Sequence, residues 1–222
     1  FDNIGYSDLS DFFYVWLRRC LQGIHPSVVS TMLTPKAEEL VANPYRHDGK
    51  ENAAKFFVDG FNTVFHRIRR GANPEVPMTV YYAYKQQDNG KDGKTSTGWH
   101  TLLDGLIGAG WEVTATWPVR SERGGRMLSV GTNALASSIV LACRPRPGDA
   151  PTTTQRAFVQ RMKCELPGAL RTLMQGDIAP VDLAQAAIGP GIAVFSSYAR
   201  VRSASGGDIG AREALELINR TL

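Results

Sequence analysis

The chain has 222 residues with a formal net charge of +4, of which 43% are hydrophobic and 21% are charged. This is the composition of an ordinary soluble globular protein with enough apolar residues for a sizeable core. It excludes membrane-spanning helices, since no apolar run approaches the ~18 residues of a span, and we recognise no signal peptide. The expected location is therefore the cytoplasm.

Three cysteines and four histidines offer no metal site. Cys20, Cys143 and Cys164 are too far apart for zinc-ligand spacing, and each lies in or beside an apolar run, so we expect small buried or half-buried side chains. The histidines share no ligand spacing. A pI of about 9.1 is compatible with nucleic acid but does not establish it.

In chain order, residues 1–5 are expected to be a loop that leaves a preceding element, so the chain looks like part of a longer protein. Apolar residues then recur at helical spacing over residues 9–20, which predicts an amphipathic helix with Ser7 as its N-cap. Further helices are expected at residues 35–41, 50–70, 97–107, 180–188 and 211–222. Strands are expected at residues 77–84, 111–117 and 135–143.

The remaining segments are less regular. Residues 144–151 have the composition of a linker, and the helical pattern after them is expected to break at Pro167. Gly189 and Gly191 are expected to end the helix at 180–188. Residues 192–201 are ambiguous between helix and strand.

The three predicted strands indicate an α/β sheet. The order strand, helix, strand over residues 77–117 predicts a right-handed βαβ crossover. In the second strand Val113, Ala115 and Trp117 alternate with polar residues, which predicts one half-buried face. No helix fits between residues 117 and 135, so the third strand is expected to be antiparallel and to lie at the sheet edge.

Two stretches carry a resemblance to a known family: FDNIGYSDLSDFFYVWLRR at residues 1–19 and GTNALASSIVLACRPR at residues 131–146. They resemble the adenine-specific DNA methylases whose longer members carry a zinc ribbon, which are class I S-adenosylmethionine-dependent amino-methyltransferases. PVDLAQAAIGPG at residues 180–191 resembles them more weakly. In that family an Asp-Pro-Pro-Tyr motif runs directly into residues like those that begin this chain.

The resemblance implies a Rossmann-like α/β fold whose last strand is antiparallel. Residues 1–146 would be the C-terminal half of the catalytic domain, on the side of the target base, and residues 147–222 a helical C-terminal extension. No catalytic motif is expected within this chain.

The resemblance also implies a binding pocket, because such enzymes flip the target base out of the duplex. The residues expected to line it are Phe1, Asp2, Asn3, Tyr6, Ser121, Glu122 and Asn133. The alternative for residues 1–5 is a frayed terminus, with Tyr6 packing on the helix behind it.

Four basic residues are candidates for contact with the phosphates of DNA: Lys85, Arg120, Arg123 and Arg126. They lie at or after the carboxyl ends of predicted strands, the edge where open α/β sheets bind ligands. The alternatives are a solvated mobile loop at residues 120–126 and a surface lysine at position 85.

The Gly-rich loop and the acidic residue that hold S-adenosylmethionine in this class are not found in the sequence. The family places them before the catalytic motif, so most of the cofactor site is expected outside this chain, which by itself would be inactive. The predicted function is part of a DNA adenine-N6 methyltransferase. The alternatives are a non-catalytic nucleic-acid-binding or interaction module and methylation of RNA or protein.

A sheet without its central strands would leave Tyr81 and Val140 uncovered. Such an apolar edge is prone to pair with another copy, so self-association is possible on this reading.

Overall fold

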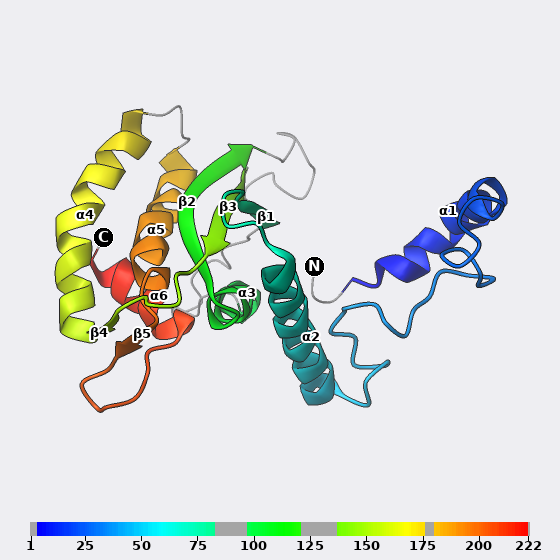
Figure 1. The fold of residues 1–222 in the computed structure, drawn as a ribbon, viewed down its shortest axis with the longest axis horizontal. Helices are drawn as coiled ribbons and strands as arrows, with labels where there is room; N and C mark the ends of the chain where they lie inside the picture. The colour runs from blue at the N-terminus through cyan, green and yellow to red at the C-terminus, as the bar shows by residue number, and fades with distance from the viewer. Residues whose placement is uncertain (1–3, 83–96, 121–136, 176–179, 222) are drawn as a thin grey trace. The chain divides into compact units, whose positions relative to one another are not determined.

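The structure, a computed structural model, describes residues 4–82, 97–120, 137–175 and 180–221. The chain divides into an N-terminal unit, residues 1–63, and a C-terminal unit, residues 64–222. The N-terminal unit holds α1 (Tyr6–Leu21) and the first part of α2 (Lys50–Gly71). The elements that follow α2 are shown in Figure 1: β1 (Met78–Tyr82), α3 (Thr97–Gly108), β2 (Trp111–Arg120), β3 (Ser137–Pro145), β4 (Thr152–Thr154), α4 (Gln155–Gln175), α5 (Pro180–Ser196), β5 (Arg200–Arg202) and α6 (Ala211–Thr221).

Helix α1 forms as predicted, but its apolar face is not buried within the described residues. Its large apolar side chains are 50% to 70% exposed, namely Leu9, Phe12, Phe13, Trp16 and Leu17. The predicted N-cap is wrong: the helix begins at Tyr6 after Gly5, without a side-chain cap. The Ser7 side chain is instead bonded to Glu39.

The helix predicted at residues 35–41 is absent from the structure, where this segment is irregular. Its side chains bond to α1 rather than to one another: Lys36 pairs with Asp11, and Glu39 accepts the backbone N–H of Ser7. Helix α2 agrees with its prediction and buries Ala53 and Phe57.

The three-stranded sheet has the order β1–β3–β2, and β3 is antiparallel to both neighbours. The predicted antiparallel pairing of β2 with β3 is confirmed. The predicted edge position of β3 is wrong, because this strand lies between the other two. Strands β1 and β2 consequently run parallel to each other with β3 between them, and α3 connects them.

A β-bulge interrupts β2, since the register with β3 shifts between Val113 and Ala115. Val113 pairs with Cys143 and Ala115 with Ala142, so the two side chains lie on opposite faces of the sheet. Val113 is fully buried while Trp117 is 51% exposed. The single half-buried face predicted for this strand is therefore wrong.

Helix α5 packs on β2, with α4 and α6 beside it (Figure 1). Gly189 and Gly191 lie inside α5 and do not end it, contrary to prediction. A Cβ atom at Gly189 would lie 1.7 Å from Thr116 Oγ1, and one at Gly191 would lie 2.7 Å from Ile218 Cγ1. These glycines thus permit close approach of the helix to β2 and to α6.

Helix α4 continues through Pro167, so the predicted break is wrong. The predicted linker contains the end of β3, and shortly after it the three-residue strand β4 pairs parallel with β5. The ambiguous region at residues 192–201 contains the end of α5 and the start of β5.

Of the cysteines, Cys143 is buried as predicted, whereas Cys20 and Cys164 are exposed, so the prediction is wrong for these two. Within the described ranges no helix combines the length and apolarity needed to span a membrane, and no group of three potential metal ligands is found.

Candidate functional site

The sheet brings the ends of three strands to one edge. Strands β1 and β2 end there and β3 begins there, since Tyr82 pairs with Ile139 and Arg120 with Ser137. Residues 83–96 and 121–136 connect to this edge. The predicted site residues that lie outside the described residues are Phe1, Asp2, Asn3, Lys85, Ser121, Glu122, Arg123, Arg126 and Asn133.

Two predicted site residues are described, Tyr6 and Arg120. Tyr6 is the first residue of α1, its side chain is 57% exposed, and its backbone N–H donates to Ile4 O at 3.1 Å. Arg120 is the last residue of β2 and pairs with Ser137 at the edge described above. The two residues belong to different units, so the pocket that would combine them stays a prediction.

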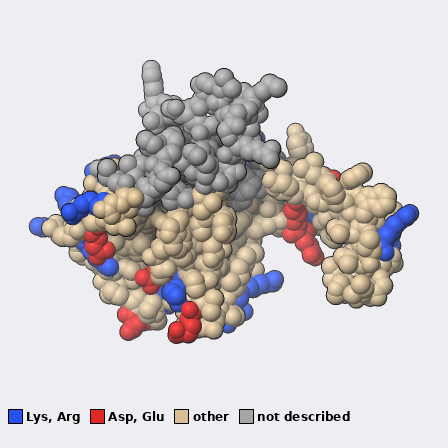
Figure 2. All heavy atoms as spheres, turned by 90° about the horizontal axis from the view of Figure 1, so that it is seen from above, with Lys and Arg blue, Asp and Glu red and all other residues tan. Residues whose placement is uncertain are grey.

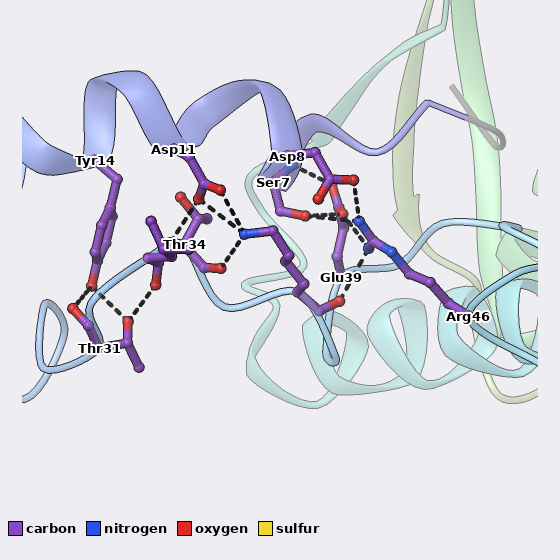
Figure 3. Close-up of polar contacts among 10 residues, drawn as sticks. Ser7, Asp8, Asp11, Tyr14, Thr31, Thr34, Glu39 and Arg46 are labelled. Carbon is purple, nitrogen blue, oxygen red and sulfur yellow. Dashed lines mark hydrogen bonds and ion pairs between the residues drawn. The ribbon is translucent and has the colours of Figure 1, made fainter.

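A cluster of polar and charged side chains fixes the start of α1 (Figure 3). We call it the Glu39–Arg46 network, and it is formed by Ser7, Asp8, Glu39 and Arg46. The Ser7 N–H donates to Glu39 Oε1 at 2.9 Å, and the Ser7 hydroxyl donates to Glu39 Oε2. Arg46 donates to Glu39 Oε2 at 2.7 Å and to Asp8 Oδ2 at 2.6 Å. A Cβ atom at Gly5 would lie 2.9 Å from Asp8 Oδ2, so a larger residue there would require the Asp8 side chain to shift.

Burial raises the pKa of Glu39, but the hydrogen bonds from Ser7 and Arg46 outweigh it and leave the pKa below its usual value. The hydrogen bond to Glu39 likewise raises the pKa of Arg46. Glu39 and Arg46 therefore form an ion pair at neutral pH. The role of the network is to hold the first turn of α1 directly after the predicted base-binding residues.

Two further contacts fasten α1 to the chain that follows it. Asp11 accepts hydrogen bonds from Lys36 Nζ at 2.9 Å and from Thr34 N at 3.0 Å, and the Lys36 bond lowers the pKa of this carboxyl group. The Tyr14 hydroxyl lies 2.8 Å from Thr31 Oγ1. Because Ser7, Asp11 and Tyr14 are at helical spacing, the packed face of α1 is polar and the apolar face remains open.

Exposed aromatic side chains also occur on the sheet. Tyr81, Val140 and Trp117 are cross-strand neighbours on one face, with Tyr81 70% and Trp117 51% exposed. Tyr81 is uncovered as predicted, whereas Val140 is buried and corrects that prediction, because it lies in the central strand. Trp117 was not predicted as a site candidate, since the bulge that turns it to this face leaves no mark in the alternation of the sequence.

On the face shown in Figure 2, charge alone does not single out a binding surface. In the view of Figure 2 the described surface carries Lys and Arg as well as Asp and Glu side chains. Local groups of like charge are therefore a better guide to a binding surface than the net charge of the chain.

No family model, curated protein or solved structure matches this chain. The family resemblance carried by residues 1–19 and 131–146 thus remains a prediction.

Proposed function

We propose that this chain is part of an S-adenosylmethionine-dependent DNA adenine-N6 methyltransferase and supplies the target-base and DNA-facing side of its catalytic domain. The observation that carries the proposal is the strand order β1–β3–β2, two parallel strands separated by an antiparallel one. This order is compatible with the end of a class I methyltransferase sheet, whose last strand is antiparallel. The segments that contain Lys85 and residues 121–133 follow or precede strands that meet at this edge, where such sheets bind ligands.

In this proposal the chain's own residues bind the target base and the DNA backbone. The exposed ring of Tyr6 offers a stacking surface for a base that has left the duplex, and such stacking contributes about 1–3 kcal/mol per base. The Glu39–Arg46 network holds Tyr6 at the start of α1 by fixing the neighbouring Ser7 and Asp8. Arg120, Arg123 and Arg126 would contact backbone phosphates.

S-adenosylmethionine would supply the methyl group to the adenine amine by direct displacement, from a site expected mostly outside this chain. This chemistry requires no cysteine nucleophile. Cys143 is buried and its pKa is raised by desolvation to about 12, so it is a neutral thiol at physiological pH.

The DNA contacts are testable with Arg123→Ala combined with Arg126→Ala. We expect weaker duplex binding and a salt slope (log affinity against log salt) that is less steep by about 2. Arg212→Ala with Arg220→Ala removes the same charge from α6 and serves as control. An unchanged slope in the first variant would show that the loop does not contact DNA.

Calorimetry tests whether this chain by itself binds the cofactor. We expect no measurable binding of S-adenosylmethionine to this chain alone. Tight binding would show that the cofactor site has been misplaced. Methyl transfer by a longer protein containing this chain, measured on duplex DNA, RNA and protein, distinguishes the possible substrates.

A second candidate is a non-catalytic interaction module, favoured by the exposed apolar face of α1 with Phe12, Phe13 and Trp16. Self-association through β1 belongs to the methyltransferase proposal as well, because β1 pairs with β3 on one side and with no strand of the described residues on the other. Sedimentation of the Thr79→Lys variant tests it, since an edge lysine opposes strand pairing. Unchanged association would exclude this edge as the interface.

A further inference from the structure

A hollow of about 500 Å³ lies between the start of α4 and the residues around the end of β5. Three basic side chains line it, Arg156, Lys163 and Arg202, and we call it the basic hollow. None of the described residues that line it is acidic.

Two elements bring these cations together. Arg156, Gln160 and Lys163 follow one another at i, i+4 and i+7 and so share a face of α4. Arg202 arrives from β5, whose parallel pairing with β4 places it opposite Thr154, two residues before Arg156. The pairing of β4 with β5 and the helical spacing in α4 therefore place the three basic side chains close together.

Nearby arginines have structural partners, in contrast to those of the basic hollow. Arg161 of α4 donates to Glu165 Oε1 at 2.7 Å and to Ser197 Oγ at 3.1 Å, and Arg200 of β5 lies 3.8 Å from Asp208. In the described part of the chain, the side chains of Arg156, Lys163 and Arg202 have neither an ion pair nor a hydrogen bond. Their positive charges are therefore not compensated by the protein and favour a bound anion.

A neighbouring hollow shows that the excess of positive charge is particular to the basic hollow. It measures about 480 Å³ and is lined by Arg212 and Arg220 together with Glu213 and Glu216, with Arg212 Nε 3.6 Å from Glu216 Oε1. Two acidic residues balance two basic ones there. The two hollows are similar in size and differ in charge, so the second supplies a matched control.

We propose that the basic hollow binds phosphate groups of a nucleic-acid backbone. The inference rests on the proposed function, in which DNA is the substrate, and it gives the helical extension a role in holding the duplex. Arg and Lys, with the Gln160 amide and the Ser203 hydroxyl beside them, are the donors that proteins commonly use for phosphate oxygens. Such contacts add affinity without reading the base sequence.

The test is fluorescence anisotropy of a labelled mixed-sequence duplex with the full chain between 50 and 200 mM salt. Arg156→Gln with Lys163→Gln is compared with Arg212→Gln and Arg220→Gln, which remove equal charge. We expect a slope less steep by about 2 for the first pair, so that the loss of affinity over this salt range shrinks about tenfold, and no such change for the second pair. Arg202→Gln is expected to reduce the slope by about 1.

The outcomes separate this inference from the proposed function. If the parent chain binds duplex and both pairs of variants keep its slope, the basic hollow is not a nucleic-acid site, and the proposed function stands. If inorganic phosphate binds through these same residues while the duplex keeps its salt slope in their variants, the ligand is a free phosphate and the inference is overturned. If the variants behave as expected but a longer protein methylates no DNA, the proposed function fails and the basic hollow remains.

Discussion

The sharpest structural prediction concerns Ser196, a fully buried residue near the end of α5. Its hydroxyl accepts the backbone N–H of Val113 at 2.9 Å and donates to Ala193 O at 3.2 Å. Val113 stands at the β2 bulge, where the ladder to β3 is irregular. Ser196 therefore satisfies a buried donor at the point where β2 reverses the faces of its side chains, before it reaches Arg120.

Ser196→Ala removes this acceptor and leaves the Val113 N–H buried without its partner. An unsatisfied buried donor costs about 1–3 kcal/mol. We expect the free energy of unfolding to fall by this amount, or the Tm by about 2–4 °C per kcal/mol in a chain of this size. Urea unfolding followed by circular dichroism measures it, with an unchanged m value indicating an unaltered unfolded state.

Ser197→Ala is the matched control. Ser197 is only half-buried, and its hydroxyl donates to Val194 O and accepts from Arg161. Its loss should cost less than about 1 kcal/mol. If Ser196→Ala is as stable as the parent, or if the two variants cost the same, the assignment of Ser196 as the support of the bulge is refuted.

Two other predictions concern thiol reactivity and acid stability. At mild alkaline pH a thiol reagent should label Cys20 and Cys164 rapidly and Cys143 only after unfolding, because burial raises the pKa of the Cys143 thiol to about 12; three equally fast thiols would contradict its burial. The lowered pKa of Glu39 stabilises the fold above the unfolded-state pKa, and this contribution is lost as pH falls through the folded-state pKa. Glu39→Gln should therefore weaken the packing of α1 at pH 7 and have little effect once the pH is below the folded-state pKa of Glu39, as amide hydrogen exchange in residues 6–21 would show. Equal protection in parent and variant at pH 7 would contradict the role given to its bonds with Arg46.

The elements with long periodic patterns were predictable from sequence. Helix α2 and strands β2 and β3 follow from apolar spacing, and the lack of helical pattern before residue 135 correctly indicated an antiparallel pair. The insertion of β3 between β1 and β2 was not predictable, because neighbour order is decided by tertiary packing and leaves no local signal.

The wrong predictions of where α5 ends and of which β2 side chains share a face have physical causes. Gly189 and Gly191 look like helix ends, but Thr116 and Ile218 pack where their side chains would be, a requirement set by distant residues. The bulge adds one residue to β2, which moves Trp117 to the face opposite Val113 while the alternation of the sequence is unbroken.

The sequence contains the pattern of the packed polar face of α1, beside the more conspicuous apolar pattern of the same helix. Ser7, Asp11 and Tyr14 recur at helical spacing and all bond to residues 31–46. At the candidate site, Tyr6 and Arg120 are the described members of the predicted set. The others lie outside the described residues, so the pocket itself remains a prediction.

The central claim is that this chain forms the nucleobase side of an adenine-methylating enzyme. Its most direct test uses the longest protein encoded with this chain, incubated with duplex DNA and methyl-labelled S-adenosylmethionine, followed by nucleoside analysis of the product. We predict label in N6-methyladenine, reduced in the Tyr6→Ala variant more than in Tyr6→Phe, since the latter keeps the stacking ring. Label found only in protein or RNA, or DNA methylation unaffected by loss of the ring, would contradict the claim.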